Sequence, residues 1–108
     1  MVTALQNSTV TALNNLSTTP ELVITANPSR TRINFHAPGA IDIYVGPTQV
    51  LLNGGNATLT PSLAAFGGTY HIFAGGDREF TGVLARQAFQ AFSASSSAQP
   101  LTIEEGFQ

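Results

Sequence analysis

The chain has 108 residues, of which 9% are charged; it contains no cysteine, and its formal net charge is −2. This length suits a single domain with a modest core, and the lack of cysteine excludes disulfides and thiolate metal sites. The four cations are all arginine and form no basic block, so we expect no nucleic-acid binding.

Globular proteins average about 25% charged residues, so the surface of this chain must be unusually poor in charge. Two interpretations are open: a soluble protein coated with Ser, Thr, Asn and Gln, or a surface that largely meets other protein, which we favour. No apolar run approaches the ~18 residues of a membrane span. The N-terminus lacks a basic region followed by an apolar block, so we expect no signal peptide.

Residues 1–20 carry no charge and are rich in Thr, Ser and Asn, a composition that disfavours a stable helix. The tetrapeptide Val-Thr-Ala-Leu occurs twice, at 2–5 and at 10–13. We interpret the segment as an extended arm, which cannot bury enough apolar area to fold alone. It should lie against either the rest of the domain or a neighbouring chain, and we favour the neighbouring chain. Its expected apolar anchors are Val2, Leu5, Val10, Leu13 and Leu16.

Residues 30–47 have the alternation of apolar and polar side chains that is typical of a β-hairpin, with Pro38-Gly39 at the turn. A two-residue loop would mix polar and apolar side chains on each face, whereas a three-residue loop over 38–40 separates them. We therefore predict the three-residue loop. The expected cross-strand pairs are Ala37 with Ile41, Phe35 with Ile43 and Ile33 with Val45 on the apolar face, and His36 with Asp42 and Asn34 with Tyr44 on the polar face.

Short strand patterns recur through the chain at intervals of roughly 8–12 residues, separated by Gly and Pro, which indicates a β-sandwich or small barrel. The segment 87–94 fits a helix or a bulged strand, and the surrounding strands favour a strand. We predict an all-β fold: a single small β-sandwich or jelly-roll-like domain over 21–108 that follows the extended N-terminal arm over 1–20. The pattern does not separate a meander from a jelly roll. The other expected strands are 21–26, 57–60, 69–74, 78–82 and 101–104.

Residues suited to catalysis are few. His36 and His71 could each meet an aspartate, but a metal site needs three or four converging ligands. There is no Gly-x-Ser-x-Gly elbow, and the Gly-Gly pairs lie between strands rather than before a helix, so they form no phosphate loop. We expect no enzyme activity, no catalytic residues, no metal and no cofactor.

Arg30 and Arg32 are two of only four cations and lie close together at the start of the predicted hairpin. Arg32 could pair with Glu21 on an adjacent strand. Alternatively, both arginines could bind carboxylates across an interface, because the guanidinium fork suits bidentate pairing.

Three stretches together resemble small virion proteins of tailed bacteriophages. An Asn-Pro-Ser-Arg turn at 27–30 precedes the strand Arg32-Ile33-x-Phe35, the sequence Asp-Ile-Tyr-Val-Gly follows at 42–46, and Leu-Thr-Ile-Glu-Glu lies at 101–105. The resemblance covers roughly residues 22–105, with 27–46 its most specific part. It is greatest to capsid decoration (cement) proteins.

This resemblance implies a β-sandwich that oligomerises on the capsid exterior, and the charge-poor surface predicts that the oligomer is a dimer or trimer. The protein would bind over junctions between major capsid proteins and stabilise the shell, without contact to nucleic acid or membrane. The alternative is a phage tail or fibre adaptor that recognises a receptor or a carbohydrate. The lack of Trp and the presence of only two Tyr count against a sugar site.

Overall fold

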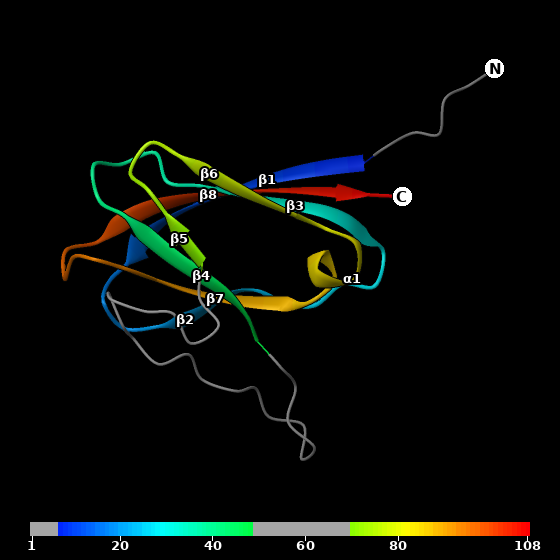
Figure 1. The fold of residues 1–108 in the computed structure, drawn as a ribbon, viewed down its shortest axis with the longest axis horizontal. Coiled ribbons are helices and arrows are strands. Elements are labelled where there is room, and N and C mark those ends of the chain that lie inside the picture. The colour runs from blue at the N-terminus through cyan, green and yellow to red at the C-terminus, as the bar shows by residue number, and fades with distance from the viewer. Residues whose placement is uncertain (1–6, 49–69) are drawn as a thin grey trace, which may run out of the picture.

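The computed structural model describes residues 7–48 and 70–108, which form two four-stranded antiparallel sheets stacked face to face (Figure 1). The strand order is β1-β8-β3-β6 in one sheet and β2-β7-β4-β5 in the other. The all-β prediction is confirmed. The elements are β1 (Asn7–Leu16), β2 (Glu21–Ile24), β3 (Arg30–His36), β4 (Ile43–Thr48), β5 (Tyr70–Ile72), β6 (Asp77–Thr81), α1 (Gly82–Ala85), β7 (Ala88–Ser93) and β8 (Gln99–Phe107).

The strands pair in nested order, with β1 on β8, β2 on β7, β3 on β6 and β4 on β5. The chain therefore resembles one long hairpin that has been folded over so that its successive segments enter alternate sheets. This is the jelly-roll arrangement, and it settles the choice between meander and jelly roll that the sequence pattern left open. The expected strand at 57–60 lies outside the described residues.

The predicted hairpin between residues 30 and 47 is wrong. β3 lies between β6 and β8 in one sheet, whereas β4 lies between β5 and β7 in the other, so the connection between them crosses from sheet to sheet. Phe35 and Ile43 are both fully buried, as predicted, but they face the core from opposite sheets. The alternating pattern identifies which side chains face inward and does not distinguish a partner in the same sheet from one across the core.

The predicted polar pairs fail for the same reason. His36 lies opposite Asp77 and Thr102, and its Nδ1 is 2.9 Å from the carbonyl oxygen of Gly76. Asp42 instead meets His71.

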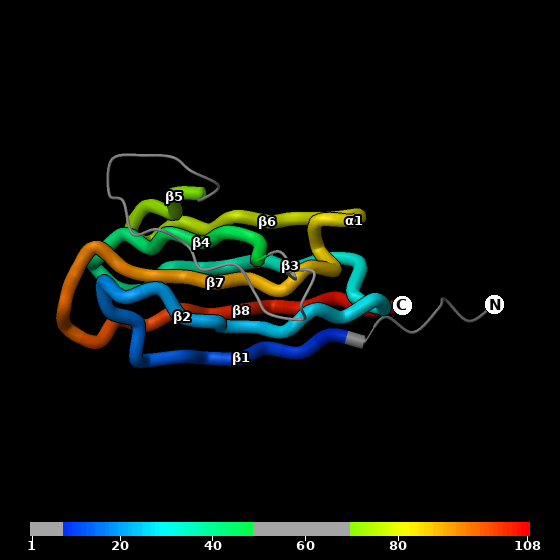
Figure 2. The backbone as a smooth tube through the Cα atoms, turned by 90° about the horizontal axis from the view of Figure 1, so that it is seen from below, coloured from blue at the N-terminus to red at the C-terminus, as the bar shows by residue number. Residues whose placement is uncertain are grey.

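The N-terminal segment is extended, as expected, but residues 7–16 pair with β8 of their own chain. In Figure 2, β1 runs along the lower margin of the molecule beside β8. Leu16 is fully buried in the common core. The sandwich therefore begins well before residue 21, and a truncation at Pro20 would remove an edge strand and a core side chain.

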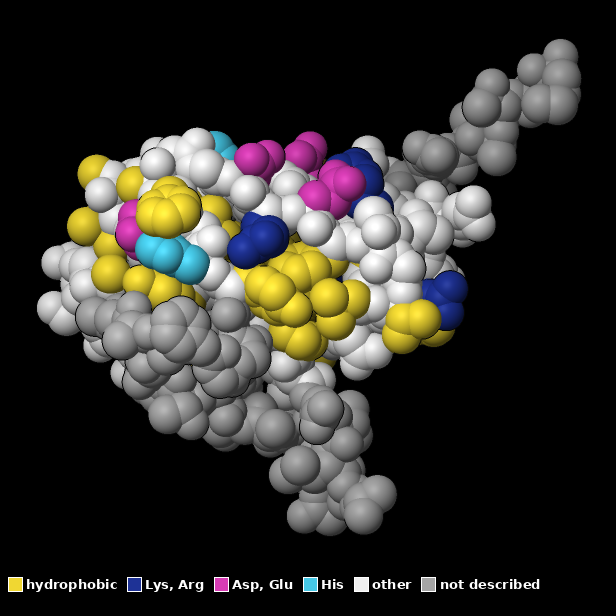
Figure 3. Space-filling view, viewed as in Figure 1, with side chains coloured by type: hydrophobic (Ala, Val, Ile, Leu, Met, Phe, Trp, Pro, Cys, Tyr) yellow, Lys and Arg dark blue, Asp and Glu magenta, His cyan; other side chains and the backbone are white. Residues whose placement is uncertain are grey.

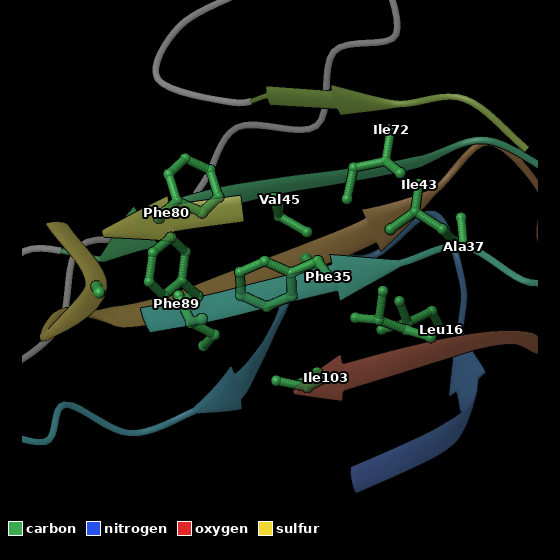
Figure 4. Packing of buried hydrophobic residues seen from close by; sticks show 13 residues of the cluster. Leu16, Phe35, Ala37, Ile43, Val45, Ile72, Phe80, Phe89 and Ile103 are labelled. Atoms are coloured by element: carbon green, nitrogen blue, oxygen red, sulfur yellow. The ribbon is translucent and has the colours of Figure 1, made fainter. Parts of the chain in front are cut away.

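Three phenylalanine rings from both sheets form the centre of the core (Figure 4). The Phe35 ring centroid lies 6.0 Å from that of Phe80 and 5.0 Å from that of Phe89, and the Phe80 and Phe89 centroids are 5.2 Å apart. Phe89 comes from β7, which is a strand as predicted and has every residue buried. The Phe35 ring therefore packs simultaneously against its own sheet and the facing one.

We predict that Phe35→Ala lowers the free energy of unfolding by about 3–5 kcal/mol, because truncation leaves a cavity between the sheets. Urea denaturation measures this loss. Phe73→Ala is the matched control: Phe73 is 68% exposed, so its truncation should change stability by less than about 0.5 kcal/mol. Equal losses for the two variants would contradict the central position of Phe35.

Candidate functional site

The described part of the sandwich has four outer strands, and three of them are protected against pairing with another chain. β6 carries three exposed charged residues, Asp77, Arg78 and Glu79, and charged side chains gather over this strand in Figure 3. β2 has only four residues and follows Pro20, and β5 has only three. Charge, proline and short length are the devices by which proteins prevent edge-to-edge association.

The fourth outer strand, β1, has none of these devices. It is ten residues long, without charge or proline, and among the described strands it pairs only with β8. Its residues from Ser8 to Ala12 are exposed, and Val10 is 66% exposed. A long, uncharged edge of this kind is a template for main-chain hydrogen bonding to another strand.

The predicted apolar anchors of the N-terminal segment lie in different environments. Val2 and Leu5 lie outside the described residues. Leu16 is a core residue, and half-buried Leu13 packs against the core. Val10 points away from the core, so among the described anchors it is the side chain most available to a partner.

Arg30 was expected at an interface but is only 1% exposed. Its Nε donates to the carbonyl of Ala85, and its Nη2 donates to the carbonyls of Thr25 (3.1 Å) and Gln87 (2.6 Å). Nη1 lies 2.9 Å from Oε2 of Glu105, whose other oxygen accepts a hydrogen bond from Thr9. The hydrogen bonds of the guanidinium are therefore all made within the subunit. They join β3 and β8 to Thr25, which follows β2, and to Gln87, which precedes β7.

Arg32 lies on the surface, with 39% of its side chain exposed. Its Nη1 is 3.3 Å from Oε1 of Glu79 on the neighbouring β6. The predicted pairing with Glu21 is wrong, because Glu21 belongs to the other sheet. A role of Arg32 at an interface stays a prediction.

His71 and Asp42 form a hydrogen bond between β5 and the β3–β4 connection, with 2.7 Å between Nε2 and Oδ2. The other carboxylate oxygen accepts the backbone N–H of Ala74 at 2.9 Å. The Ala74 hydrogen bond, followed by the bond to His71, lowers the pKa of Asp42. Tyr44 stacks on the His71 ring, with centroids 4.6 Å apart; burial, and secondarily the charge of Asp42, raise the pKa of Tyr44.

Through these two hydrogen bonds, Asp42 joins the β3–β4 connection to His71 and Ala74. Within the described residues, no three His, Cys, Asp or Glu side chains converge as metal ligands would. The described part of the chain also holds no helix long and apolar enough to cross a membrane. The expectations of no metal and no enzyme activity stay predictions.

Sequence reasoning missed two surface features. One is the unprotected edge of β1: the absence of charge over 1–20 was visible, but its position at the margin of a sheet was not. The other is Phe73, which is 68% exposed and packs against His71 with ring centroids 4.2 Å apart.

No protein-family model and no curated protein matches this chain. Solved structures with a similar fold include a protein of Bacillus endospore appendages, described as a novel family of disulfide-linked pili: TM-score 0.54, 11% identity, covering 96% of this chain and 87% of that one. They also include the SPBc2 prophage-derived protein YomS: TM-score 0.53, 13% identity, covering 99% of this chain and 97% of that one. At such identities the likeness establishes the shared fold.

We predict that Arg30→Met lowers the free energy of unfolding by about 3–5 kcal/mol, because Glu105 and three carbonyls lose their buried partner. Arg32→Met is the matched control on the same strand, and its exposed pair with Glu79 should contribute only about 0.2–1 kcal/mol. Guanidinium-chloride unfolding of both variants gives the comparison. A loss for Arg30→Met no larger than that for Arg32→Met would show that the buried network is not a main source of stability.

The hydrogen bonds to the Asp42 carboxylate should make stability depend on pH in the acid range. Because folding lowers the pKa below its ordinary value of 3.8, the stabilisation is complete above that pH and is lost as the pH falls through the lowered pKa. The difference in unfolding midpoint between the protein and Asp42→Asn should therefore be largest near about pH 6 and shrink towards about pH 2.5. A difference that stays constant over this range would rule out the carboxylate charge as its source.

Proposed function

We propose that this chain is a structural protein of a bacteriophage particle, and specifically a decoration protein on the capsid exterior. The observation that carries the proposal is the unprotected edge of β1. In a free monomer, a ten-residue strand without charge at the margin of a sheet is a site of unwanted association. A protein that assembles uses such an edge for main-chain pairing.

The fold supports the phage context. It is shared over nearly the whole length of both chains with the prophage-derived protein YomS, and the stretches at 27–46 and 101–105 resemble phage virion proteins. The shared fold with a pilus protein supports self-assembly. This chain has no cysteine, so its own assembly would depend on noncovalent contacts rather than on disulfide linkage.

The decoration role is a binding role. The protein would bury its charge-poor surface across junctions between major capsid proteins, and the area removed from water would stabilise the shell. No catalytic step is required, and we propose that the chain is not an enzyme.

A second candidate is a tail or fibre adaptor that recognises a receptor or carbohydrate. The specific observation is Phe73, whose exposed ring lies against His71, which in turn binds Asp42. An open aromatic face beside a carboxylate can bind a sugar through ring packing and hydroxyl hydrogen bonds.

Particles produced by the phage genome that encodes this chain provide the test. We expect quantitative mass spectrometry to find the protein at a fixed copy number per particle, and immunogold labelling to place it on heads. Heads that lack it should release DNA at a lower temperature, and adding purified protein should restore their stability in a saturable manner. Labelling on tails would favour the adaptor, and absence from particles would overturn both roles.

A further inference from the structure

The outer edge of β1 is an interaction surface whose partner can be identified from the shape and charge of the available strands. Ser8 to Ala12 are exposed on both faces of the sheet, so no other described element overhangs this part of the edge. The strand ends at Leu16, whose carbonyl oxygen accepts a hydrogen bond from the Ser93 hydroxyl. The strand pairing is irregular between Leu13 and Leu16, so the regular accessible part of the edge is Ser8 to Ala12.

A second copy of this chain offers four outer strands in its described part, and only one of them fits. β2 and β5 have four and three residues against the ten of β1. β6 would place Asp77, Arg78 and Glu79 beside hydroxyl and alanine side chains that carry no opposite charge. β1 of the second copy matches in length and brings no charge. We propose that two copies pair through β1, antiparallel about a twofold axis, and merge their four-stranded sheets into one of eight strands.

The twofold axis fixes the sheet face on which side chains meet, and an axis centred on the exposed residues Ser8 to Ala12 places Val10 opposite Val10 of the second copy. An antiparallel pair about such an axis places side chains of the same sheet face opposite each other. In β1, Thr11 and Leu13 pair with the core residues Ile103 and Leu101 and lie on the inner face of the sheet, so Val10 and Ala12 lie on the outer face. Pairing thus brings the Val10 side chains of the two copies together and covers part of their exposed apolar surface.

Electrostatics does not oppose this arrangement. The nearest charge on the outward face is Glu104, which lies opposite Val10 on β8. In the joined sheet, the two β1 strands separate the β8 strands of the two copies, so the glutamates stand about 14 Å apart at a strand spacing of roughly 4.8 Å. This exceeds the Debye length of about 8 Å at physiological salt, and the repulsion is screened.

The proposal rests on the assembly function proposed above, and it names the partner and the mode of contact. Sedimentation equilibrium of the full chain in solution tests it without capsids. We expect a species of twice the 11.3 kDa chain mass. Val10→Lys should raise the dimer dissociation constant at least about tenfold, because it places like charges opposite each other across the axis.

Val83→Lys is the matched control. Val83 is 69% exposed, against 66% for Val10, and it lies on α1 directly after β6, at the opposite edge of the same sheet. Its substitution should leave the dissociation constant unchanged. Thermal unfolding of both variants verifies that the monomer fold is intact. In Val10→Lys the introduced ammonium would have Glu104 as a cross-strand partner, so we expect no loss of monomer stability.

Spin labels give an independent measurement, because the chain has no native cysteine. Labels on Val10→Cys should show strong dipolar coupling between copies, and labels on Val83→Cys should show much weaker coupling. A monomer at all concentrations, a dimer insensitive to Val10→Lys, or coupling stronger at position 83 would each overturn the proposal. If the protein is a monomer that still binds heads, the dimer proposal fails and the decoration role remains. If the protein dimerises through β1 but is absent from particles, the decoration role fails and the dimer proposal remains.

Discussion

The hydrogen bonds of the buried Arg30 guanidinium hold the two sheets together at the end of the sandwich where β2 ends and β3 and β7 begin. A cation that is 1% exposed is stable only if its donors are satisfied, and this one reaches Glu105 and the carbonyls of Thr25, Ala85 and Gln87. Thr25 follows β2 and Gln87 precedes β7, while Arg30 and Glu105 belong to the other sheet. One planar side chain therefore holds together the two layers at this end, a geometry that the point charge of lysine could not reproduce.

The turn before β3 places Arg30 where this network needs it. The side-chain oxygen of Asn27 accepts a hydrogen bond from the backbone N–H of Ser29, and the backbone carbonyl of Asn27 accepts one from the N–H of Arg30. The Asn27 backbone N–H in turn donates to the carbonyl of Arg86. The Asn-Pro-Ser-Arg stretch at 27–30 therefore has a structural role, because its turn places the Arg30 side chain in the interior.

Local patterns in the sequence were sufficient to identify strands and inward-facing residues, but not strand partners. Phe35 and Ile43 alternate with polar neighbours and are fully buried, yet the same alternation suggested a hairpin that does not form. A Pro-Gly turn is equally compatible with a connection that crosses between sheets. The guanidinium fork of Arg30 suggested carboxylate pairing across an interface, whereas its partners include backbone carbonyls of residues 85 and 87, which belong to no recognisable motif. The candidate site could likewise be predicted only in part. The lack of charge in β1 is visible in the sequence, whereas its position at the edge of a sheet depends on the pairing with β8.

The nested pairing of the strands also determines the order in which the fold can form during synthesis. Asn7 pairs with Phe107, so the first described strand must wait until the last described strand has been made before it finds its partner. Closing such a long loop is entropically costly, and topologies rich in distant contacts fold slowly. On a ribosome, the uncharged β1 would remain without its partner until β8 emerges, at the stage when incomplete chains are most prone to aggregate. The strand that forms the open edge of the finished subunit is thus also the strand that remains unpaired longest during synthesis.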